Sequence, residues 1–535
     1  MTTTTTAYRT DTPTGRDGFA QLLGGEWTKF RTVSGWLIAT AAAAVVMVLL
    51  GVLTAAGSHS SYGSTPANPN GIVGHPYVPI GPDGEAVSDS FYFVHRPLHG
   101  AGSITSKVSS LTARLAPRGP GSANQSPPAA TTGGVQPWTK AGLIIKANTS
   151  QGSPYAAIMV TGSHGVRMQY NYTGDIAGPS ETVSTTSPQW LRLTRAGDTI
   201  TGYASTDGTT WTTVGAIHLT SLPTTVQAGP FVASPDKRTF TQQLGSGSAT
   251  GGPTIATATF GALDLRSQQP TSTWTGTDVG ASPQGAGGLP AADAGGFQTA
   301  GGTYTLTGSG DIAPDAGQSG ASIERTLIGG FAALLVMIVL GVLFITTEYR
   351  RGLIRTSLTV SPRRARVLLA KATVIGAVTF VTGLVGAAIA IPISEHIQRA
   401  NGNYINPLTA TTEIRVIAGT AALLAVAAVF GLAVGTILRR SAAAITAVVA
   451  LVVLPYILAT SGALSAGGSD WLLRVSPAAG FAIQQSIPAY PQVDLAYTPT
   501  AGFYPLAPWA GFAVMCAWAA LALGVAIYLL RRRDA

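Results

Sequence analysis

Six uncharged apolar runs limit what this chain of 535 residues can fold into. Each run has about 20 residues or more, the length that a helix needs to cross the hydrocarbon core of a membrane. The composition agrees, because 46% of the residues are hydrophobic and only 10% are charged, whereas soluble proteins carry about a quarter of charged residues. We therefore predict an α-helical polytopic membrane protein with six transmembrane helices, at residues 35–56, 327–346, 372–393, 416–438, 442–463 and 507–530.

Basic residues flank these runs on one side of the predicted membrane. Segment 347–371 holds seven Lys or Arg residues against one acid, Glu348. Cytoplasmic loops carry such an excess of positive charge, so we predict a multi-pass protein of the cell membrane with both termini in the cytoplasm. The net charge of +9 then reflects topology, and we expect no binding to nucleic acid. Further basic flanks on the same side are Lys29, Arg31, Arg439, Arg440 and Arg531 to Arg533.

The N-terminal region divides into two parts. Residues 1–17 are polar, rich in Thr and without apolar periodicity, which predicts a disordered cytoplasmic tail. Residues 18–31 place apolar side chains on one helical face, which predicts an amphipathic helix at the inner membrane surface. An ordinary juxtamembrane anchor is the alternative. The residues that characterise this predicted interfacial helix are Glu26, Trp27, Lys29 and Arg31.

The sequence offers no energy source for transport within the chain. Pumps and ion-coupled transporters usually carry ionisable residues inside the membrane, and the six apolar runs contain no Asp, Glu, Lys, Arg or His. The phosphate-binding motif G-x-x-x-x-G-K-[ST] is also absent from the sequence. We therefore expect no catalytic residue, cofactor or metal site in this chain, and we expect a separate ATPase subunit to supply the energy.

Two motifs, GGEWTKFRTVSGW before the first run and TTEYRRGLIRTSLTVSPRRARVLLAKA after the second, resemble the membrane subunit of ABC-2 type transporters, especially those of actinobacteria. The resemblance covers residues 19–31 and 325–535. It implies a coupling helix in segment 347–371 that docks on an ATP-binding subunit, which binds ATP and Mg. The alternative is that the arginines only fix topology and touch lipid headgroups. The residues that would make the docking contact are Glu348, Tyr349, Arg350, Arg351, Gly352, Arg355 and Thr356.

The resemblance also implies partners and a direction of transport. A unit of six spans needs a second permease chain, identical or different, to enclose a pathway, and the expected activity is export. Residues 465–506 would form short re-entrant outer helices or, alternatively, a simple outer loop. The competing function is a membrane-anchored receptor that binds a cell-wall glycan or a protein.

The long segment 57–325, between the first two runs, has a different pattern. Several short stretches alternate apolar and polar residues, which predicts strands of an antiparallel β-sandwich outside the cytoplasm. Asp207-Gly208 lies between two of them and predicts a hairpin, since Gly adopts positive φ easily. The alternating stretches are KAGLIIKA, YAAIMVTG, GVRMQYNY, QWLRLTRAG, TITGYAST, TWTTVGAIHL and ATATFGALDL.

Residues 88–265 of this insert resemble concanavalin-like, lectin-like sandwich domains, on the pieces DSFYFVHRPLHGAGSITSKV, WTKAGLIIKA and PQWLRLTRAGDTITGYASTDGTTWTTVG. We expect residues 295–312 to add a strand that closes the same sandwich, or else to form a separate hairpin. The His and carboxylate residues have no spacing typical of metal or glycosidase sites. A binding or structural role is therefore expected, with Tyr170, Tyr172 and Trp190 as possible contacts to an extracellular ligand.

Overall fold

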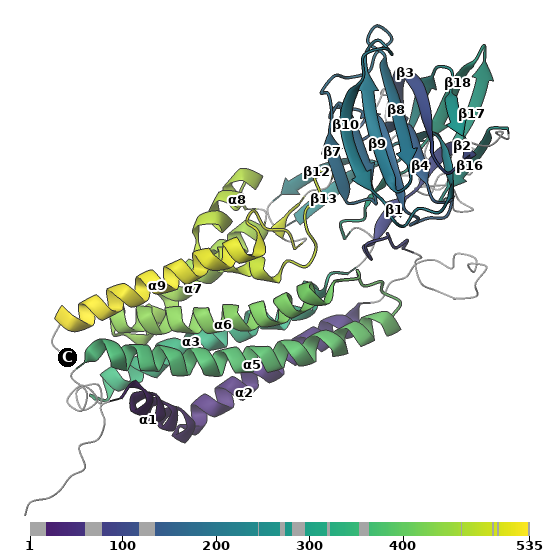
Figure 1. Cartoon of the computed structure of the whole chain (residues 1–535). Coiled ribbons are helices and arrows are strands. Elements are labelled where there is room, and N and C mark those ends of the chain that lie inside the picture. The colour runs from purple at the N-terminus through teal and green to yellow at the C-terminus, as the bar shows by residue number, and fades with distance from the viewer. Residues whose placement is uncertain are drawn as a thin grey trace, which may run out of the picture.

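A computed structural model shows a helical domain and a β domain joined end to end (Figure 1). The structure describes residues 18–58, 78–116, 134–243, 246–267, 273–280, 295–317, 321–352, 363–461, 463–494, 497–499 and 502–532. The predicted tail 1–17 lies outside these residues. We call the end of the helical domain beside the β domain the proximal end, and the opposite end, where α1 lies, the distal end.

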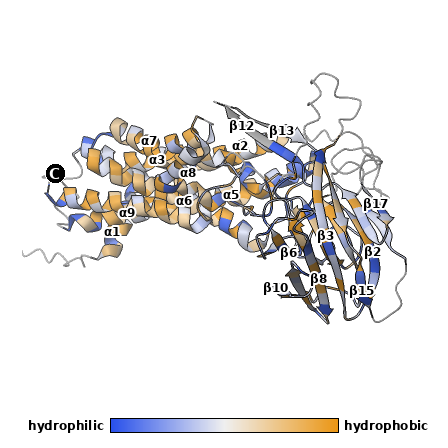
Figure 2. Cartoon of the chain, turned by 90° about the horizontal axis from the view of Figure 1, so that it is seen from above, coloured by the Kyte–Doolittle hydropathy of each residue, from blue (hydrophilic) through white to orange (hydrophobic). Residues whose placement is uncertain are grey.

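Among the described residues, the helical domain contains six helices that are long and apolar enough to cross a membrane. Hydrophobic residues cover them along most of their length, in contrast to the mixed surface of the β domain (Figure 2). Helix α6 packs against α3, α5, α7 and α9, which gives it a central place in the bundle. The six helices are α2 (Ser34–Gly57), α3 (Ile328–Arg350), α5 (Arg364–Ala400), α6 (Ala410–Leu438), α7 (Ser441–Thr460) and α9 (Pro508–Arg532).

Glycines bring the central helices into close contact. A Cβ atom at Gly341 of α3 would overlap the carbonyl oxygen of Ala428 in α6, and one at Gly431 of α6 would lie 2.9 Å from that of Ile338. Such small residues let membrane helices approach each other and gain van der Waals contact. The crossing of α3 and α6 therefore depends on residues without side chains.

Several helices extend beyond the apolar runs that predicted them, whereas α7 ends at Thr460, before the end of its run. Helix α5 begins at Arg364 and ends at Ala400, whereas the apolar run covers residues 372–393. The predicted loop 347–371 is accordingly shorter than expected, since its first residues belong to α3 and its last residues to α5. Polar residues at both helix ends continue the hydrogen-bonded backbone outside the apolar region, so hydropathy alone underestimates helix length.

Short helices occupy part of the segment between α7 and α9. Helix α8 (Ala466–Val475) and the 3-10 helix η4 (Pro477–Gln484) follow each other, and η4 packs against α6 and α9. Its residues Pro477 to Ile483 are buried. The structure thus agrees with short helices packed against protein rather than with a simple loop.

The β domain lies between α2 and α3 in sequence and consists of two large antiparallel sheets with a shared apolar core. The seven-stranded sheet runs in the order β16 (Thr275–Val279), β2 (Phe91–His99), β11 (Thr225–Ala233), β4 (Lys140–Lys146), β5 (Tyr155–Thr161), β6 (Val166–Tyr170) and β7 (Gly174–Ala177). The eight-stranded sheet runs in the order β10 (Thr212–His218), β9 (Thr199–Ser205), β8 (Gln189–Ala196), β3 (Gly102–Leu115), β14 (Thr254–Phe260), β18 (Thr303–Gly308) and β17 (Gly295–Ala300), and β15 (Asp264–Ser267) also pairs with β3.

The predicted hairpins are present. Strands β9 and β10 pair antiparallel around Asp207 and Gly208, where Gly208 has a φ of +76°. The carboxylate of Asp207 accepts hydrogen bonds from the main-chain N–H groups of Thr209 and Thr210, which fixes the turn. Strands β17 and β18 form a hairpin of their own, and β18 also pairs with β14. Residues 295–308 are therefore both a hairpin and part of the sandwich.

Both chain connections to the membrane helices meet at one place in the β domain. Strand β1 (Val87–Asp89) follows α2 in the chain, and β19 (Ile312–Pro314) precedes α3. The two strands pair antiparallel and form a small sheet of their own. This pairing brings the ends of the insert together at the proximal end of the helices, a role that the sequence assigned to residues 295–312.

We predict that Gly341→Ala destabilises the helical domain, because the new methyl group forces α3 away from α6. Overpacking of this kind typically costs about 1–3 kcal/mol. The measurement is the temperature of half-unfolding of the purified chain in detergent. Gly524→Ala is the matched control, since a Cβ there has no neighbour within 4 Å. An equal unfolding temperature for both variants would contradict the close crossing.

Candidate functional site

A cluster of four charged side chains joins three helices at the distal end. Lys371 of α5 lies 2.6 Å from Glu26 of α1 (Phe19–Thr32) and 2.5 Å from Glu348 of α3. Lys29 of α1 completes the cluster, at 2.9 Å from Glu26 and 3.3 Å from Glu348. Two lysines and two carboxylates thus balance each other in charge. We call these four residues the distal charge cluster.

Three members of the distal charge cluster are buried. The exposed fraction is 0% for Lys371, 4% for Glu26 and 6% for Glu348, while Lys29 is half-buried. Aromatic rings lie close by, with the Lys371 ammonium 5.0 Å from the centre of the Phe344 ring, which in turn contacts Phe30. Charges removed from water need each other as partners, so the cluster holds α1, α3 and α5 in one arrangement.

The burial of Glu348 and Glu26 corrects two sequence interpretations. Glu348 was expected to contact a partner subunit, but its carboxylate points into the bundle and binds Lys371. Glu26 was expected on the polar side of an interfacial helix, but it is also turned inward to Lys371. The reason is that Lys371, far away in sequence, provides a positive charge that both acids can reach. Trp27 and Arg31 remain on the outer side of α1, with Trp27 46% exposed.

Other predicted docking residues lie at the exposed end of α3. Arg350, Arg351 and Gly352 are exposed, and Gly352 has a φ of +70°, a conformation that ends the helix. Tyr349 is half-buried under the guanidinium of Arg439, which lies 5.2 Å from its ring centre. Arg355 and Thr356 lie outside the described residues. The structure therefore separates an exposed group, Arg350 to Gly352, from the buried Glu348.

We predict that Lys371→Met destabilises the chain more than a surface change does, because it leaves Glu26 and Glu348 buried with only Lys29 as a counter-charge. Removing one partner of a buried pair typically costs about 3–5 kcal/mol. The measurement is again the unfolding temperature in detergent. The triple variant Lys371→Met, Glu26→Gln, Glu348→Gln removes the uncompensated charges and should recover part of the loss. Equal losses in the single and triple variants would contradict the electrostatic role.

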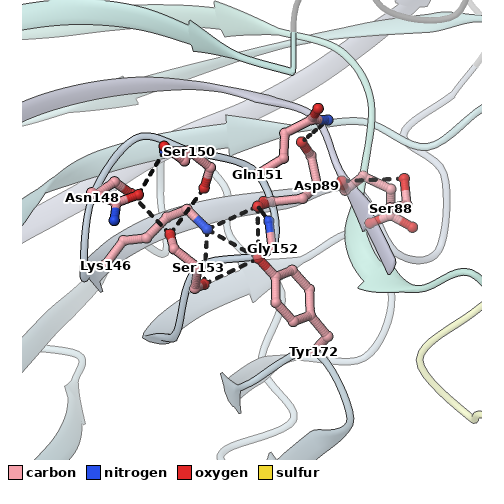
Figure 3. A network of polar contacts seen from close by, with 10 residues as sticks. Ser88, Asp89, Lys146, Asn148, Ser150, Gln151, Gly152, Ser153 and Tyr172 are labelled. Carbon is pink, nitrogen blue, oxygen red and sulfur yellow. Dashed lines mark hydrogen bonds and ion pairs between the residues drawn. The ribbon is translucent and has the colours of Figure 1, made fainter. Parts of the chain in front are cut away.

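A second buried network holds the β domain together near its connection to the helices (Figure 3). Asp89 of β1 accepts hydrogen bonds at Oδ2 from Lys146 of β4 at 2.8 Å, from the hydroxyl of Tyr172 at 2.6 Å and from the N–H of Gly152 at 2.8 Å. Lys146 also donates to the carbonyl of Ser153. Burial lowers the pKa of the Lys146 ammonium below its ordinary value, although Asp89 opposes this shift. Burial likewise raises the pKa of Tyr172, so its hydroxyl stays a donor.

The other end of strand β4 is anchored in the same way. Lys140 donates to the Asp311 carboxylate and to the Ile312 carbonyl, each at 2.7 Å. Lys140 and Lys146 are both fully buried. One lysine thus binds β1, which follows α2, and the other binds the start of β19, which precedes α3. The two chain connections are held on one rigid strand of the sandwich.

The segment before α9 docks directly on this part of the β domain. The side-chain amide of Gln492 donates to the carbonyls of Tyr172 and Thr173, at 3.2 and 3.1 Å. Next to it, Val493 packs with Ala313 of β19 and with Ala316, which follows β19. Tyr172 has a φ of +63°, which is strained for an aromatic residue. A strained turn at the end of β6 is therefore held from inside by Asp89 and from outside by Gln492.

The three predicted ligand contacts of the β domain lie in different environments. The prediction for Tyr172 is wrong because its side chain is fully buried and binds Asp89. Tyr170 is half-buried and packs against the sandwich core. Trp190 stays half-buried at the surface, beneath Gly208, with the Lys107 ammonium 5.9 Å from its ring. Consecutive residues of a strand lie on opposite faces of the sheet. At the end of β6, however, the face away from the sandwich core is also covered, because Asp89 and Gln492 bind Tyr172 there.

We predict that Asp89→Asn lowers the stability of the β domain, since Lys146 would remain buried without its counter-charge. The expected loss is about 3–5 kcal/mol, measured by thermal unfolding of the full chain. The double variant Asp89→Asn, Lys146→Met should lose less than the single variant. If the two losses are equal, the ion pair does not carry the contribution assigned to it.

The described residues contain no group of three or more His, Cys, Asp or Glu side chains that could hold a metal ion. The charged clusters at the distal end and in the β domain bind other parts of the same chain. The structure contains a bundle of membrane helices whose distal end is held together by ion pairs. The β domain is attached to the proximal end of this bundle. This arrangement defines a multi-pass membrane protein with a large β domain between its first two spans.

The family follows from a comparison with known sequence families. The model of the ABC-2 family transporter protein matches residues 225–535, which is more than half of the chain. The chain therefore belongs to the ABC-2 transporter family. Membership implies an ATP-binding partner subunit. No match was found among the curated proteins.

Some solved structures are similar to about two fifths of the chain. SCP-B, a member of the eqolisin family of peptidases, in a complex with the tripeptide Ala-Ile-His, has 8% identity and a TM-score of 0.24, covering 41% of this chain and 98% of that one. Scytalido-glutamic peptidase with a transition state analog inhibitor has 9% identity and a TM-score of 0.25, with the same coverage. A functionally unknown protein from Saccharomyces cerevisiae has 14% identity and a TM-score of 0.20, covering 38% of this chain and 83% of that one. Scores this low support no conclusion about this chain.

Proposed function

We propose that this chain is the permease subunit of an ATP-driven exporter. The single observation that carries the proposal is the distal charge cluster, which ties α1, α3 and α5 together beside the segment that links α3 to α5. A displacement of that segment moves the transmembrane helices α3 and α5 and the N-terminal helix α1 together. Such a joint suits a subunit that receives force from a separate ATP-binding partner.

In this proposal the distal end faces the cytoplasm, and both termini lie there. Exposed Arg350, Arg351 and Gly352 form the docking surface, together with Arg355 and Thr356 from the neighbouring segment. Arginines form charge-assisted hydrogen bonds with carboxylates or carbonyls of a partner groove. Glu348, one turn further into α3, does not dock but passes the displacement to Lys371 and thereby to α5.

The chain itself has no enzymatic role in this proposal. ATP and Mg bind to the partner subunit, and this chain holds no cofactor. A second permease chain, identical or different, completes the pathway within the membrane. We assign no role in binding nucleic acid, because the basic residues lie at helix ends, where they set orientation.

We assign the β domain a role in binding or gating cargo outside the cell. Its attachment by β1, β19 and Gln492 supports gating, since these contacts link it to α2, α3 and the segment before α9. A receptor for a cell-wall glycan or a protein is the second candidate. The observation that favours it is a surface group of aromatic and basic residues, in which Arg192 lies 3.9 Å over the ring of Trp211 and Lys107 lies beside Trp190.

We predict that the double variant Arg350→Ala, Arg351→Ala loses its ATP-binding partner during gentle purification of the tagged chain from its host. Each charge-assisted hydrogen bond contributes about 1.5–3 kcal/mol, so the recovered partner should fall by about tenfold or more. The measurement is quantitative mass spectrometry of co-purified proteins that contain a G-x-x-x-x-G-K-[ST] motif.

The matched control is Arg399→Ala, an exposed arginine of α5 near the proximal end, paired only with Glu395 among its described neighbours. It should retain the partner in full. If the double variant and the control retain equal amounts of partner, docking does not use Arg350 and Arg351. If the unaltered chain recovers no ATP-binding protein under mild detergents, the exporter proposal fails and the receptor becomes the better explanation.

A further inference from the structure

A cavity of about 420 Å³ lies at the proximal end of the helical domain, between the first turns of α6 and α9 and the segment after η4. This volume is within the range of small-molecule sites, about 300–1,000 Å³. No residue of the distal charge cluster lines this cavity, and neither do the residues that hold the β domain in place, Asp89, Lys140, Lys146 and Gln492. The residues that line it are Thr412, Arg415, Gln485, Ser486, Ile487, Pro488, Ala489, Tyr504, Pro505, Leu506, Ala507 and Pro508.

Of the described residues that line this cavity, Arg415 is the only charged one. Its guanidinium donates to the main-chain carbonyls of Ile483 at 3.3 Å and Gln485 at 2.7 Å, which are at the end of η4. Among the described residues it forms no ion pair. Glu324 is the nearby acid, but it accepts a hydrogen bond from Ser486 and does not line the cavity. The guanidinium therefore has no carboxylate in direct contact among the described residues, and Glu324 interacts with it only electrostatically over a longer distance.

The remaining walls add to the positive potential and supply an apolar floor. Thr412 lies in the first turn of α6, and Ala507 and Pro508 lie at the start of α9, so the positive ends of two helix dipoles face this region. The other side is formed by apolar residues such as Ile487, Pro488 and Leu506. A cation, two helix N-termini and an apolar wall together suit a ligand with an anionic head and an apolar body.

The depth of the cavity in the membrane agrees with such a ligand. Arg415 immediately precedes the apolar part of α6, and Trp509 in the first turn of α9 is 64% exposed. Exposed tryptophans at helix ends mark the headgroup level of a bilayer. An unpaired charge at the edge of a membrane span indicates a functional contact. The anionic head would thus sit at the level of lipid headgroups.

We propose that this cavity binds an amphiphile with an anionic headgroup, such as a phosphate ester, through Arg415. Arginine presents paired donors that match phosphate and carboxylate oxygens. The inference goes beyond the proposed function, and it does not depend on a partner ATPase. The bound molecule also lies next to the β domain, since Ser486, Ile487 and Pro488 separate this cavity from a smaller one of about 60 Å³ whose far wall includes Glu85 and Ala316.

The test uses the full chain in nanodiscs and in detergent. Native mass spectrometry compares the binding of phosphatidylglycerol with that of phosphatidylcholine, and titration with inorganic phosphate and glycerol 3-phosphate distinguishes a soluble anion from a lipid. We expect Arg415→Gln to weaken phosphatidylglycerol binding by about tenfold or more, given the strength of charge-assisted hydrogen bonds. Arg399→Gln, which removes an exposed arginine near the same end, should leave binding unchanged.

A pair of variants at Ala507 separates a ligand role from a structural role of Arg415. Ala507 is exposed at the edge of the cavity. It takes no part in the hydrogen bonds of Arg415 to η4, so its substitution leaves them in place. Ala507→Glu should weaken binding of phosphatidylglycerol, and Ala507→Lys should strengthen it. Equal binding of phosphatidylglycerol and phosphatidylcholine, or opposite charges at Ala507 without effect, would overturn the proposal. Binding of inorganic phosphate as tight as that of lipid would support a soluble anion as the source.

Discussion

The ammonium of Lys371 sets how the distal ends of three helices pack. An ionised side chain that leaves water loses several kcal/mol of solvation unless opposite charges surround it. Lys371 is fully buried, and among the described residues its opposite charges are Glu26 and Glu348. Helices α1, α3 and α5 therefore have one favourable arrangement at this end, and a displacement of any one of them must move or break these contacts.

Buried lysines constrain the β domain in the same way, and both of them lie on strand β4. Both of its terminal lysines are buried, and each holds one of the chain connections that lead to the membrane helices. Because neither lysine can leave its carboxylate at low cost, the small β1–β19 sheet stays on the sandwich. The strands that lead to the membrane helices are thus fixed on the sandwich rather than loosely attached to it.

Local patterns in the sequence are sufficient for much of this fold. Apolar runs predict the six helices, and alternation predicts strands such as β4 and the hairpin at Asp207. What local patterns cannot give is the partner of a charge. Glu348 follows an apolar run and Lys371 precedes one, which suggests solvent, whereas their partners come from segments distant in sequence. Tyr172 has the same alternating position as the core residues Val166 and Met168, but its positive φ after β6 places its side chain against Asp89 instead.

The two ends of the helical domain are connected by continuous helices. Helix α5 has 37 residues, with Pro392 inside it, and at about 1.5 Å per residue it runs from the distal charge cluster to the proximal end. There Asn401 and Asn403 donate to the carbonyls of Ala55 and Ser58 at the end of α2. Helix α3 likewise connects Glu348 to the residues that follow β19. These helices thus form the direct connection between the distal charge cluster and the base of the β domain, and Pro392, which lacks a main-chain N–H donor, is the position where the hydrogen bonding of α5 is weakened.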